Sequence, residues 1–305
     1  SFWPLFPIRK DIIDLHGTQW TKPGKMVSVG PFILDSYQFE NKIVMKANPH
    51  YWRSRGNVTE VVVQIIKDSA TALKVFKTGG IQMMQDFSPD DLKQARAMPE
   101  FKTFPYLKSN YLAFKIKGTL AENINLRKAI VHAIDKKPIP KILNGTQKIA
   151  TSFVPPRIVG YDSKMGVDYD PSLAKSYLKK SGIDPAKVQI DLVARNSERP
   201  RIITQYIQSE LKQNLGLNVQ IQLFDHKVYR SQITTQNIPM MLQVWAADYP
   251  DGDSFVGLFE SNTGNNLTKY ANPKVDENIV KAREEWNTLK REKLYREAQN
   301  LIQVQ

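Results

Sequence analysis

The chain has 305 residues, of which 41% are hydrophobic and 24% charged, a composition typical of a globular protein. Its length allows roughly two domains, and no stretch approaches the roughly 18 consecutive apolar residues of a membrane-spanning helix. Because cysteine is absent, the sequence excludes disulfides, thiolate nucleophiles and cysteine-bound metal clusters.

The net charge of +13, from 43 Lys and Arg against 30 Asp and Glu, raises nucleic acid as a partner. The basic residues are nevertheless spread along the chain and mixed with acids, and the densest runs are pairs such as Lys179-Lys180. No basic stripe alternates with aromatic residues, as a single-strand binder requires. We therefore expect a solvated basic surface and no nucleic-acid partner.

The first third of the chain is rich in predicted strands. Alternating apolar residues predict a meander, β-branched residues predict a further strand, and Ser69 is the expected N-cap residue of a helix. The expected elements are a short helix over 11–15, a meander over 26–45, a strand over 58–66, a helix over 69–77, a short strand over 81–84, a helix from 88 and extended chain over 101–117.

From about residue 120, helices and strands alternate, which is typical of an α/β domain. The expected elements are helices over 125–134, 171–181, 198–214, 227–235 and 273–301, and strands over 188–193, 217–224 and 238–247. Gly182 and Gly216 mark two helix ends. The last helix is expected to bury an apolar stripe of Ile279, Trp286, Leu289, Leu294 and Ala298.

The most informative stretch covers residues 244–252. It follows an apolar run over 238–247 that fits a strand buried on both faces. The run ends in Asp248, an aromatic residue and a Pro-Asp-Gly turn, so one carboxylate lies where a buried strand meets a loop. Ligands of open α/β sheets usually bind at such strand ends. The alternative is that Asp248 only caps the turn.

Seven motifs occur in a fixed order along nearly the whole chain. Together they resemble the oligopeptide-binding proteins of bacterial ABC importers, which are family 5 extracellular solute-binding proteins. The motifs are Trp20-Thr21-Lys22-Pro23-Gly24 with Gly30-Pro31-Phe32, Asn48-Pro49-His50-Tyr51-Trp52, Gly79-Gly80-Ile81-Gln82, Arg127-Lys128-Ala129-Ile130 with Ala133-Ile134-Asp135-Lys136, Pro155-Pro156, Tyr169-Asp170-Pro171, and Trp245-Ala246-Ala247-Asp248-Tyr249.

The resemblance implies an α/β fold of the periplasmic-binding-protein type (type II, two-lobed), with mixed sheets flanked by helices. Residues 1–110 would form a β-rich, incomplete part of the first lobe, and residues 111–305 the second lobe. Family members are longer, so the chain is expected to be a fragment lacking the N-terminal segment and the C-terminal end. The implied protein is a periplasmic or lipid-anchored extracytoplasmic monomer that delivers peptides to the permease subunits of an ABC transporter.

The resemblance also assigns a role to the last motif. Asp248 stands where relatives pair a carboxylate with the α-amino group of a bound peptide, and such a contact is a strong, charge-assisted hydrogen bond. Trp245 and Tyr249 would form the walls of the ligand pocket next to Ala247. A position in the hydrophobic core is an equal alternative for Trp245.

Further ligand contacts are expected outside the motif. Tyr111 stands where relatives have pocket tyrosines, with core packing as the alternative, and Gln85 and Asp86 stand at a position near the ligand. The sequence also departs from relatives, because residues 240–244 contain none of the arginines that hold a peptide C-terminus in some of them. A preference for one peptide length is therefore not expected.

The rival hypotheses are a binder of another solute, such as a dipeptide, a nickel complex or a sugar, and a hydrolase that uses Asp248, Asp251 and Asp253. These aspartates do not match a calcium-loop pattern, and the four histidines show no HExxH spacing. No GxSxG, Walker A or GxGxxG motif occurs. We therefore expect no enzymatic activity, cofactor or metal.

Overall fold

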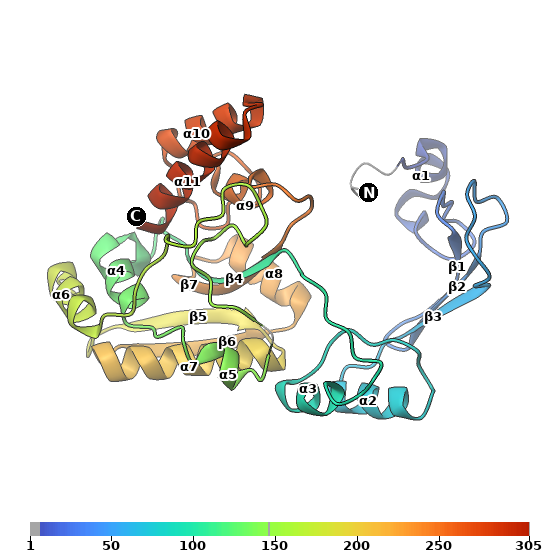
Figure 1. The fold of residues 1–305 in the computed structure, drawn as a ribbon, viewed down its shortest axis with the longest axis horizontal. Helices are drawn as coiled ribbons and strands as arrows, with labels where there is room; N and C mark the ends of the chain where they lie inside the picture. Colours follow the sequence, from blue (N-terminus) through green and yellow to red (C-terminus); the bar gives the residue numbers. More distant parts are fainter. Residues whose placement is uncertain (1–6, 146, 305) are drawn as a thin grey trace. The chain divides into compact units, whose positions relative to one another are not determined.

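The computed structural model describes residues 7–145 and 147–304. The chain divides into two compact units, Ser1–Asp91 and Leu92–Gln305 (Figure 1). This division into compact units does not test the predicted assignment of residues 1–110 to the first lobe and residues 111–305 to the second. That assignment stays a prediction. Within the described part of the chain, no helix is long and apolar enough to cross a membrane.

The first unit contains an antiparallel three-stranded sheet in the order β1-β2-β3. β1 and β2 confirm the later part of the meander predicted over 26–45, whereas residues 26–31 form no strand. Asp68, and not Ser69, is the N-cap residue of α2, because its Oδ1 accepts the Thr71 N–H at 2.7 Å. The elements are α1 (Lys10–His16), the 3-10 helix η2 (Gly17–Gln19), β1 (Phe32–Gln38), β2 (Lys42–Ala47), β3 (Glu60–Gln64), α2 (Ser69–Lys77) and α3 (Pro89–Ala95), which continues into the second unit.

The prediction of a short strand over 81–84 is wrong. These residues are irregular chain between α2 and α3. Their apolar pattern resembles that of a strand, but a strand persists only where a neighbour satisfies its backbone groups. No strand of the described residues pairs with this segment.

The second unit is built on a four-stranded mixed sheet in the order β4-β7-β5-β6 (Figure 1). β4 (Lys108–Phe114) runs antiparallel to β7 (Met240–Ala246), whereas β5 (Gln189–Arg195) is parallel to both β7 and β6 (Asn218–Phe224). The helices are η3 (Leu120–Glu122), α4 (Ile124–His132), α5 (Ile139–Ile142), α6 (Pro171–Ser181), α7 (Glu198–Leu215), α8 (His226–Thr235), α9 (Asp253–Val256), η4 (Gly257–Phe259), α10 (Pro273–Glu284) and α11 (Thr288–Val304).

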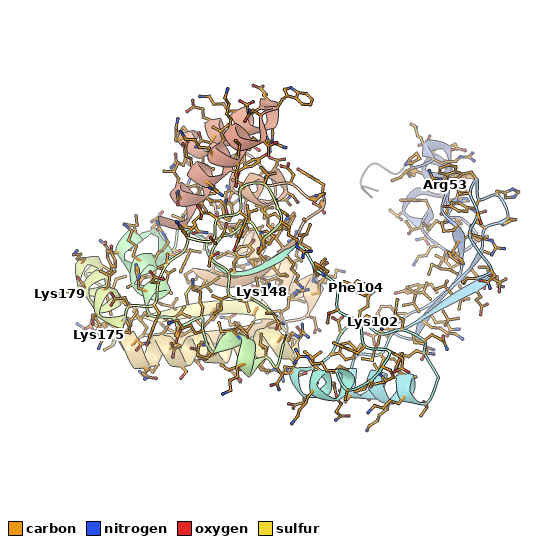
Figure 2. The ribbon with its side chains drawn as sticks, in the orientation of Figure 1. Arg53, Lys102, Phe104, Lys148, Lys175 and Lys179 are labelled. Atoms are coloured by element: carbon orange, nitrogen blue, oxygen red, sulfur yellow. The ribbon has the colours of Figure 1, made fainter. Side chains whose placement is uncertain are left out.

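Local signals fix several helix ends where the sequence predicts them. Asp170 caps α6 by accepting the Leu173 N–H at 2.9 Å, and α6 and α7 end at Gly182 and Gly216, each with φ near +71°. The basic side chains Lys175 and Lys179 of α6 are exposed (Figure 2). One core cluster joins the apolar faces of α4, α6 and α7 to the sheet.

The prediction of one helix over 273–301 is also wrong. The chain breaks at 285–287, and α10 and α11 pack against each other. Trp286 and Leu289, expected in the buried stripe, are 98% and 75% exposed. In a single helix Ile279 and Ala298 would lie about 28 Å apart, but the break brings both into one core cluster. Burial of two helix faces in one core outweighs helix continuity.

Candidate functional site

The C-terminal half of β7 has an open edge. On one side β7 pairs with β4 along its whole length, from Met240 to Ala246. On the other side it pairs with β5 only at Met240 and Met241. The next carbonyl, that of Leu242, accepts the Tyr229 hydroxyl at 2.8 Å. Beyond this point, no strand of the described residues pairs with β7 on that side.

The direction of the backbone groups follows from the ladder with β4. The Ala247 N–H donates to the Leu107 carbonyl at 2.8 Å, so odd-numbered residues of β7 face β4. The N–H and C=O groups of Val244 and Ala246 therefore point away from β4, and no hydrogen bond within residues 7–145 and 147–304 engages them. We call residues 244–246 the open edge. It can accept another extended chain as a neighbour.

Asp248 lies two residues beyond the open edge. Its backbone N–H donates to the Ser254 hydroxyl at 3.0 Å, which anchors the loop at this residue. Its side chain is exposed, and none of the described residues gives its carboxylate a hydrogen bond or an ion pair. The N–H of the turn residue Asp253 is instead accepted by Asp251 Oδ1 at 2.9 Å. Capping of this turn therefore does not occupy Asp248.

The two neighbouring aspartates are fully engaged. Asp251 pairs with Arg291 Nη1 at 2.7 Å and accepts the Tyr295 hydroxyl at 3.0 Å. Asp253 accepts Arg283 Nε at 2.8 Å and the Tyr249 hydroxyl at 2.6 Å. Their side chains are only 16% and 15% exposed. Among the described residues, the carboxylates of Asp251 and Asp253 have a compensating cation and that of Asp248 has none.

This arrangement does not support an acidic catalytic cluster. Two of the three aspartates of the hydrolase hypothesis are committed to arginines, and general acid–base chemistry needs a carboxyl group free to reach a substrate. Among the described residues, no group of three His, Cys, Asp or Glu side chains could hold a metal ion.

Gly252 packs the loop closely against α11. A Cβ atom there would lie 2.4 Å from the Val159 carbonyl oxygen and 2.6 Å from Tyr295 Cδ2. We expect Gly252→Ala to lower the free energy of unfolding by about 1–3 kcal/mol, the usual cost of overpacking. The measurement is a urea unfolding curve for each variant. Gly264→Ala is the matched control, because nothing lies within 4 Å of its added Cβ. Equal midpoints for the two variants would contradict the prediction.

The predicted aromatic site residues lie around the same strand pair. Trp245 packs against the core cluster that contains Phe153 and Phe255, and its indole Nε1 is buried without a hydrogen-bond acceptor among the described atoms. Tyr111 of β4 lies directly opposite Gln243. Its ring meets Phe153 edge to face at 4.8 Å, and burial raises the pKa of its phenol to about 12. Both residues thus contribute to packing, and their ligand contacts stay predictions.

The remaining predicted residues are divided between the two units. Ala247 and Tyr249 flank Asp248, and the hydroxyl of Tyr249 is held by Asp253. Gln85 and Asp86 are exposed residues of the first unit, in the irregular chain before α3. The structure therefore groups Tyr111 with the Trp245–Tyr249 segment, while a role for Gln85 and Asp86 stays a prediction.

Sequence reasoning missed the supports of this loop. Ser254, Arg283, Arg291 and Tyr295 belong to no motif that points to them. The contact partners Arg283 and Asp253 are 30 residues apart, and Tyr295 and Asp251 are 44 apart. The one available signal was that Asp251 and Asp253 closely follow a buried strand, where partly buried carboxylates need cations to pair with.

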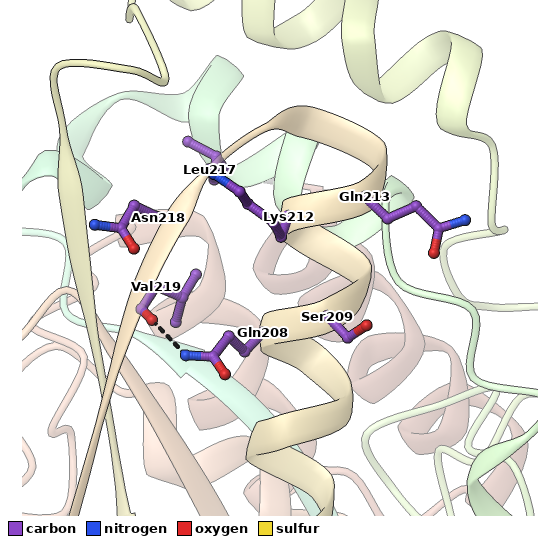
Figure 3. Close-up of a pocket in the computed structure, with 7 residues that line it drawn as sticks. All are labelled: Gln208, Ser209, Lys212, Gln213, Leu217, Asn218 and Val219. Carbon is purple, nitrogen blue, oxygen red and sulfur yellow. Dashed lines mark hydrogen bonds between the residues drawn. The ribbon is translucent and has the colours of Figure 1, made fainter.

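A surface depression of about 520 Å³ lies elsewhere, between α7 and β6 (Figure 3). The side chain of Gln208 crosses it and donates to the Val219 carbonyl at 2.7 Å. β6 is the edge strand on the far side of β5 from β7, so this depression is separate from the open edge. It contains none of the predicted site residues. It is lined by Gln208, Ser209, Lys212, Gln213, Leu217, Asn218 and Val219.

Known proteins resemble this chain in both sequence and structure. A curated relative from Escherichia coli K12, named "Probable deoxycholate-binding periplasmic protein YgiS", is 25% identical over 313 residues. The periplasmic murein peptide-binding protein MppA of the same organism is 28% identical over 315 residues. Each alignment covers 99% of this chain and 58% of the relative. The chain thus spans 58% of the length of these relatives.

The structural comparison agrees with the sequence comparison. The solved structure of the murein tripeptide binding protein MppA of Escherichia coli matches with a TM-score of 0.91 at 26% identity, over 98% of this chain and 61% of that chain. The predicted type II periplasmic-binding-protein fold is thereby confirmed. The model of "Bacterial extracellular solute-binding proteins, family 5 Middle" matches residues 2–267. The chain therefore belongs to the family 5 bacterial extracellular solute-binding proteins, a family of binding proteins and not of enzymes.

Proposed function

We propose that this protein binds peptides in an extended conformation and delivers them to the permease of an ABC transporter. The observation that carries the proposal is that an open strand edge ends next to an exposed carboxylate that no cation of the described residues pairs with. An extended peptide can pair with residues 244–246 in the place that β5 leaves after Met241. Main-chain hydrogen bonds then supply affinity that depends little on peptide sequence.

Asp248 determines the direction in which the peptide binds in this proposal, because it holds the peptide N-terminus. A peptide N-terminus is a compact cation with three donors, and a carboxylate at the end of the strand accepts from it by charge-assisted hydrogen bonds. Because Asp251 and Asp253 are already paired with arginines, the ammonium group is directed to Asp248. No arginine occurs at 240–244 to hold the other end, so peptide length is loosely specified.

The setting proposed for this activity follows that of the relatives. YgiS and MppA are named as periplasmic proteins. We place this protein in the periplasm, or on the outer side of the membrane as an anchored lipoprotein, acting as a monomer. Its partners are the peptide ligand and the permease subunits.

The test is retention of ligand by the full-length protein, measured by native mass spectrometry. The samples are a pool of tri- to pentapeptides, the same pool after N-acetylation, and deoxycholate. We expect many free-amine peptides to be retained, with the acetylated pool bound at least about tenfold more weakly. Retention of deoxycholate with no peptide bound would replace the peptide by another class of solute.

A further inference from the structure

Three sets of contacts hold the loop that carries Asp248. Its start is anchored by the hydrogen bond from the Asp248 N–H to Ser254 Oγ at 3.0 Å. Asp251 is held from α11 by Arg291 and by the hydroxyl of the fully buried Tyr295. Asp253 is held from α10 by Arg283. Two helices distant in sequence thus fix a loop that contains no regular structure before α9.

Arg283 is the branching point of these contacts. Its Nε donates to Asp253 at 2.8 Å, while Nη1 and Nη2 donate to the two carboxylate oxygens of Glu260 at 3.3 Å and 2.9 Å. One guanidinium therefore ties together the start of α9 and the residue after η4. A lysine has the same charge but a single ammonium head, so it cannot reproduce this planar, three-donor arrangement.

The arginines also determine which acid remains uncompensated. Asp251, Asp253 and Glu260 are matched by Arg283 and Arg291, and the three carboxylates are only 15–27% exposed. Asp248 is the exposed acid of the loop, and no arginine or lysine in the described part of the chain pairs with it. A mobile loop would move this carboxylate relative to the open edge, and a hydrogen bond to an ammonium group requires a fixed donor–acceptor distance.

We infer that Arg283, together with Arg291 and Tyr295, is a positioning group for ligand recognition: it holds the Asp248 carboxylate in line with the open edge, and it acts without touching the ligand. The part of the inference that concerns ligand recognition rests on the proposed function. The other part, that Arg283 keeps residues 246–253 ordered, can be measured without any ligand.

The test compares Arg283→Lys with Arg296→Lys in the full-length protein. Arg296 lies on α11 and is as exposed as Arg283, 41% against 40%. It pairs with Glu292, Asp162 and the Tyr161 carbonyl, and no hydrogen bond or ion pair among the described residues joins it to residues 246–253. Both substitutions keep the net charge, so a difference between them reports geometry and not electrostatic attraction. Tyr295→Phe removes a single hydroxyl and gives a second, independent variant.

Two readouts are needed. Hydrogen exchange by mass spectrometry measures the amides of 246–253, and calorimetry measures the ratio of dissociation constants for N-acetylated and free peptide. For Arg283→Lys and Tyr295→Phe we expect faster exchange and a ratio lowered roughly three- to tenfold, the value of one or two hydrogen bonds. Arg296→Lys is expected to match the wild type in both. A merely structural role would change thermal stability without changing the ratio.

The outcomes separate the two claims. If hydrogen exchange of residues 246–253 is unchanged in Arg283→Lys, the inference is overturned whatever the ligand is. If exchange is faster but the ratio of the two dissociation constants is unchanged, Arg283 orders the loop without affecting ligand recognition, and that part of the inference is overturned. If wild-type protein binds free and N-acetylated peptide with nearly equal dissociation constants, the ammonium anchor of the proposed function is removed. The role of Arg283 in ligand recognition then fails with it. Faster exchange in Arg283→Lys would still support the positioning of the loop.

Discussion

Replacing Asp248 with alanine is expected to weaken binding of peptides with a free α-amino group by about 2–5 kcal/mol, the usual cost of truncating one partner of a close charge pair. This corresponds to a loss of affinity of at least about thirtyfold. The reason is that no second carboxylate can take over, because Asp251 and Asp253 are held by Arg291 and Arg283. N-acetylated peptides, which have no ammonium group, are expected to bind wild type and variant equally.

The measurement is calorimetric titration of wild type and variant with the free and the acetylated form of one peptide. Asp248→Asn is the sharper companion variant, because it keeps the shape and one acceptor oxygen while it removes the charge, and we expect an intermediate loss. Asp184→Ala controls for a general change in surface charge, since Asp184 is an exposed acid on another loop. Equal affinities in all combinations of protein and peptide would remove Asp248 from ligand binding.

The second large effect is expected in the core beneath the loop. Phe255 of α9 is completely buried, and its ring lies 5.9 Å from that of Phe153 in an edge-to-face arrangement. Phe153 also contacts Tyr111 and Phe259, at 4.8 Å and 5.1 Å. Phe255→Ala therefore leaves a cavity among aromatic rings and is expected to cost about 3–5 kcal/mol of unfolding free energy.

Differential scanning calorimetry checks this expectation. A loss of that size lowers Tm by roughly 6–20 °C for a unit of this length. Phe104→Ala is the matched control, because Phe104 is exposed in an irregular segment of the same unit (Figure 2). We expect its Tm to stay close to that of the wild type. Similar shifts for the two variants would mean that the cluster around Phe153 does not support this unit.

Much of the secondary structure was predictable because its signals are local. The ends of α6 and α7 depend on residues that lie in or next to those helices, such as Asp170, Gly182 and Gly216. Strands with one buried face, such as β6, show their alternation directly. Two of the failures, over 81–84 and at 285–287, have a common cause. A strand requires a partner and a helix requires a surface to pack on, and neither requirement is visible in a short window of sequence.

The candidate site was predictable in position but not in chemistry. The apolar run and the turn after it were enough to place Asp248 at the end of a central strand, and the motif series was enough to indicate the family. Tyr111 and Trp245 were separate candidates, and only the pairing of β4 with β7 brings them into one region. Gln85 and Asp86 belong to the other unit, so their part in a site stays a prediction.

Motifs and local residue patterns were enough to indicate the family, the type of fold, most helix ends and a carboxylate at the end of β7. That no described cation pairs with this carboxylate, and that the strand edge beside it is open, became visible in the three-dimensional structure alone. The physical reason is that both properties are set by partners. Arg283, Arg291 and Tyr295 reach the loop from α10 and α11, and β5 stops pairing with β7 after Met241. A residue's type and its neighbours in sequence determine what it can bind, while long-range packing determines what is left for a ligand.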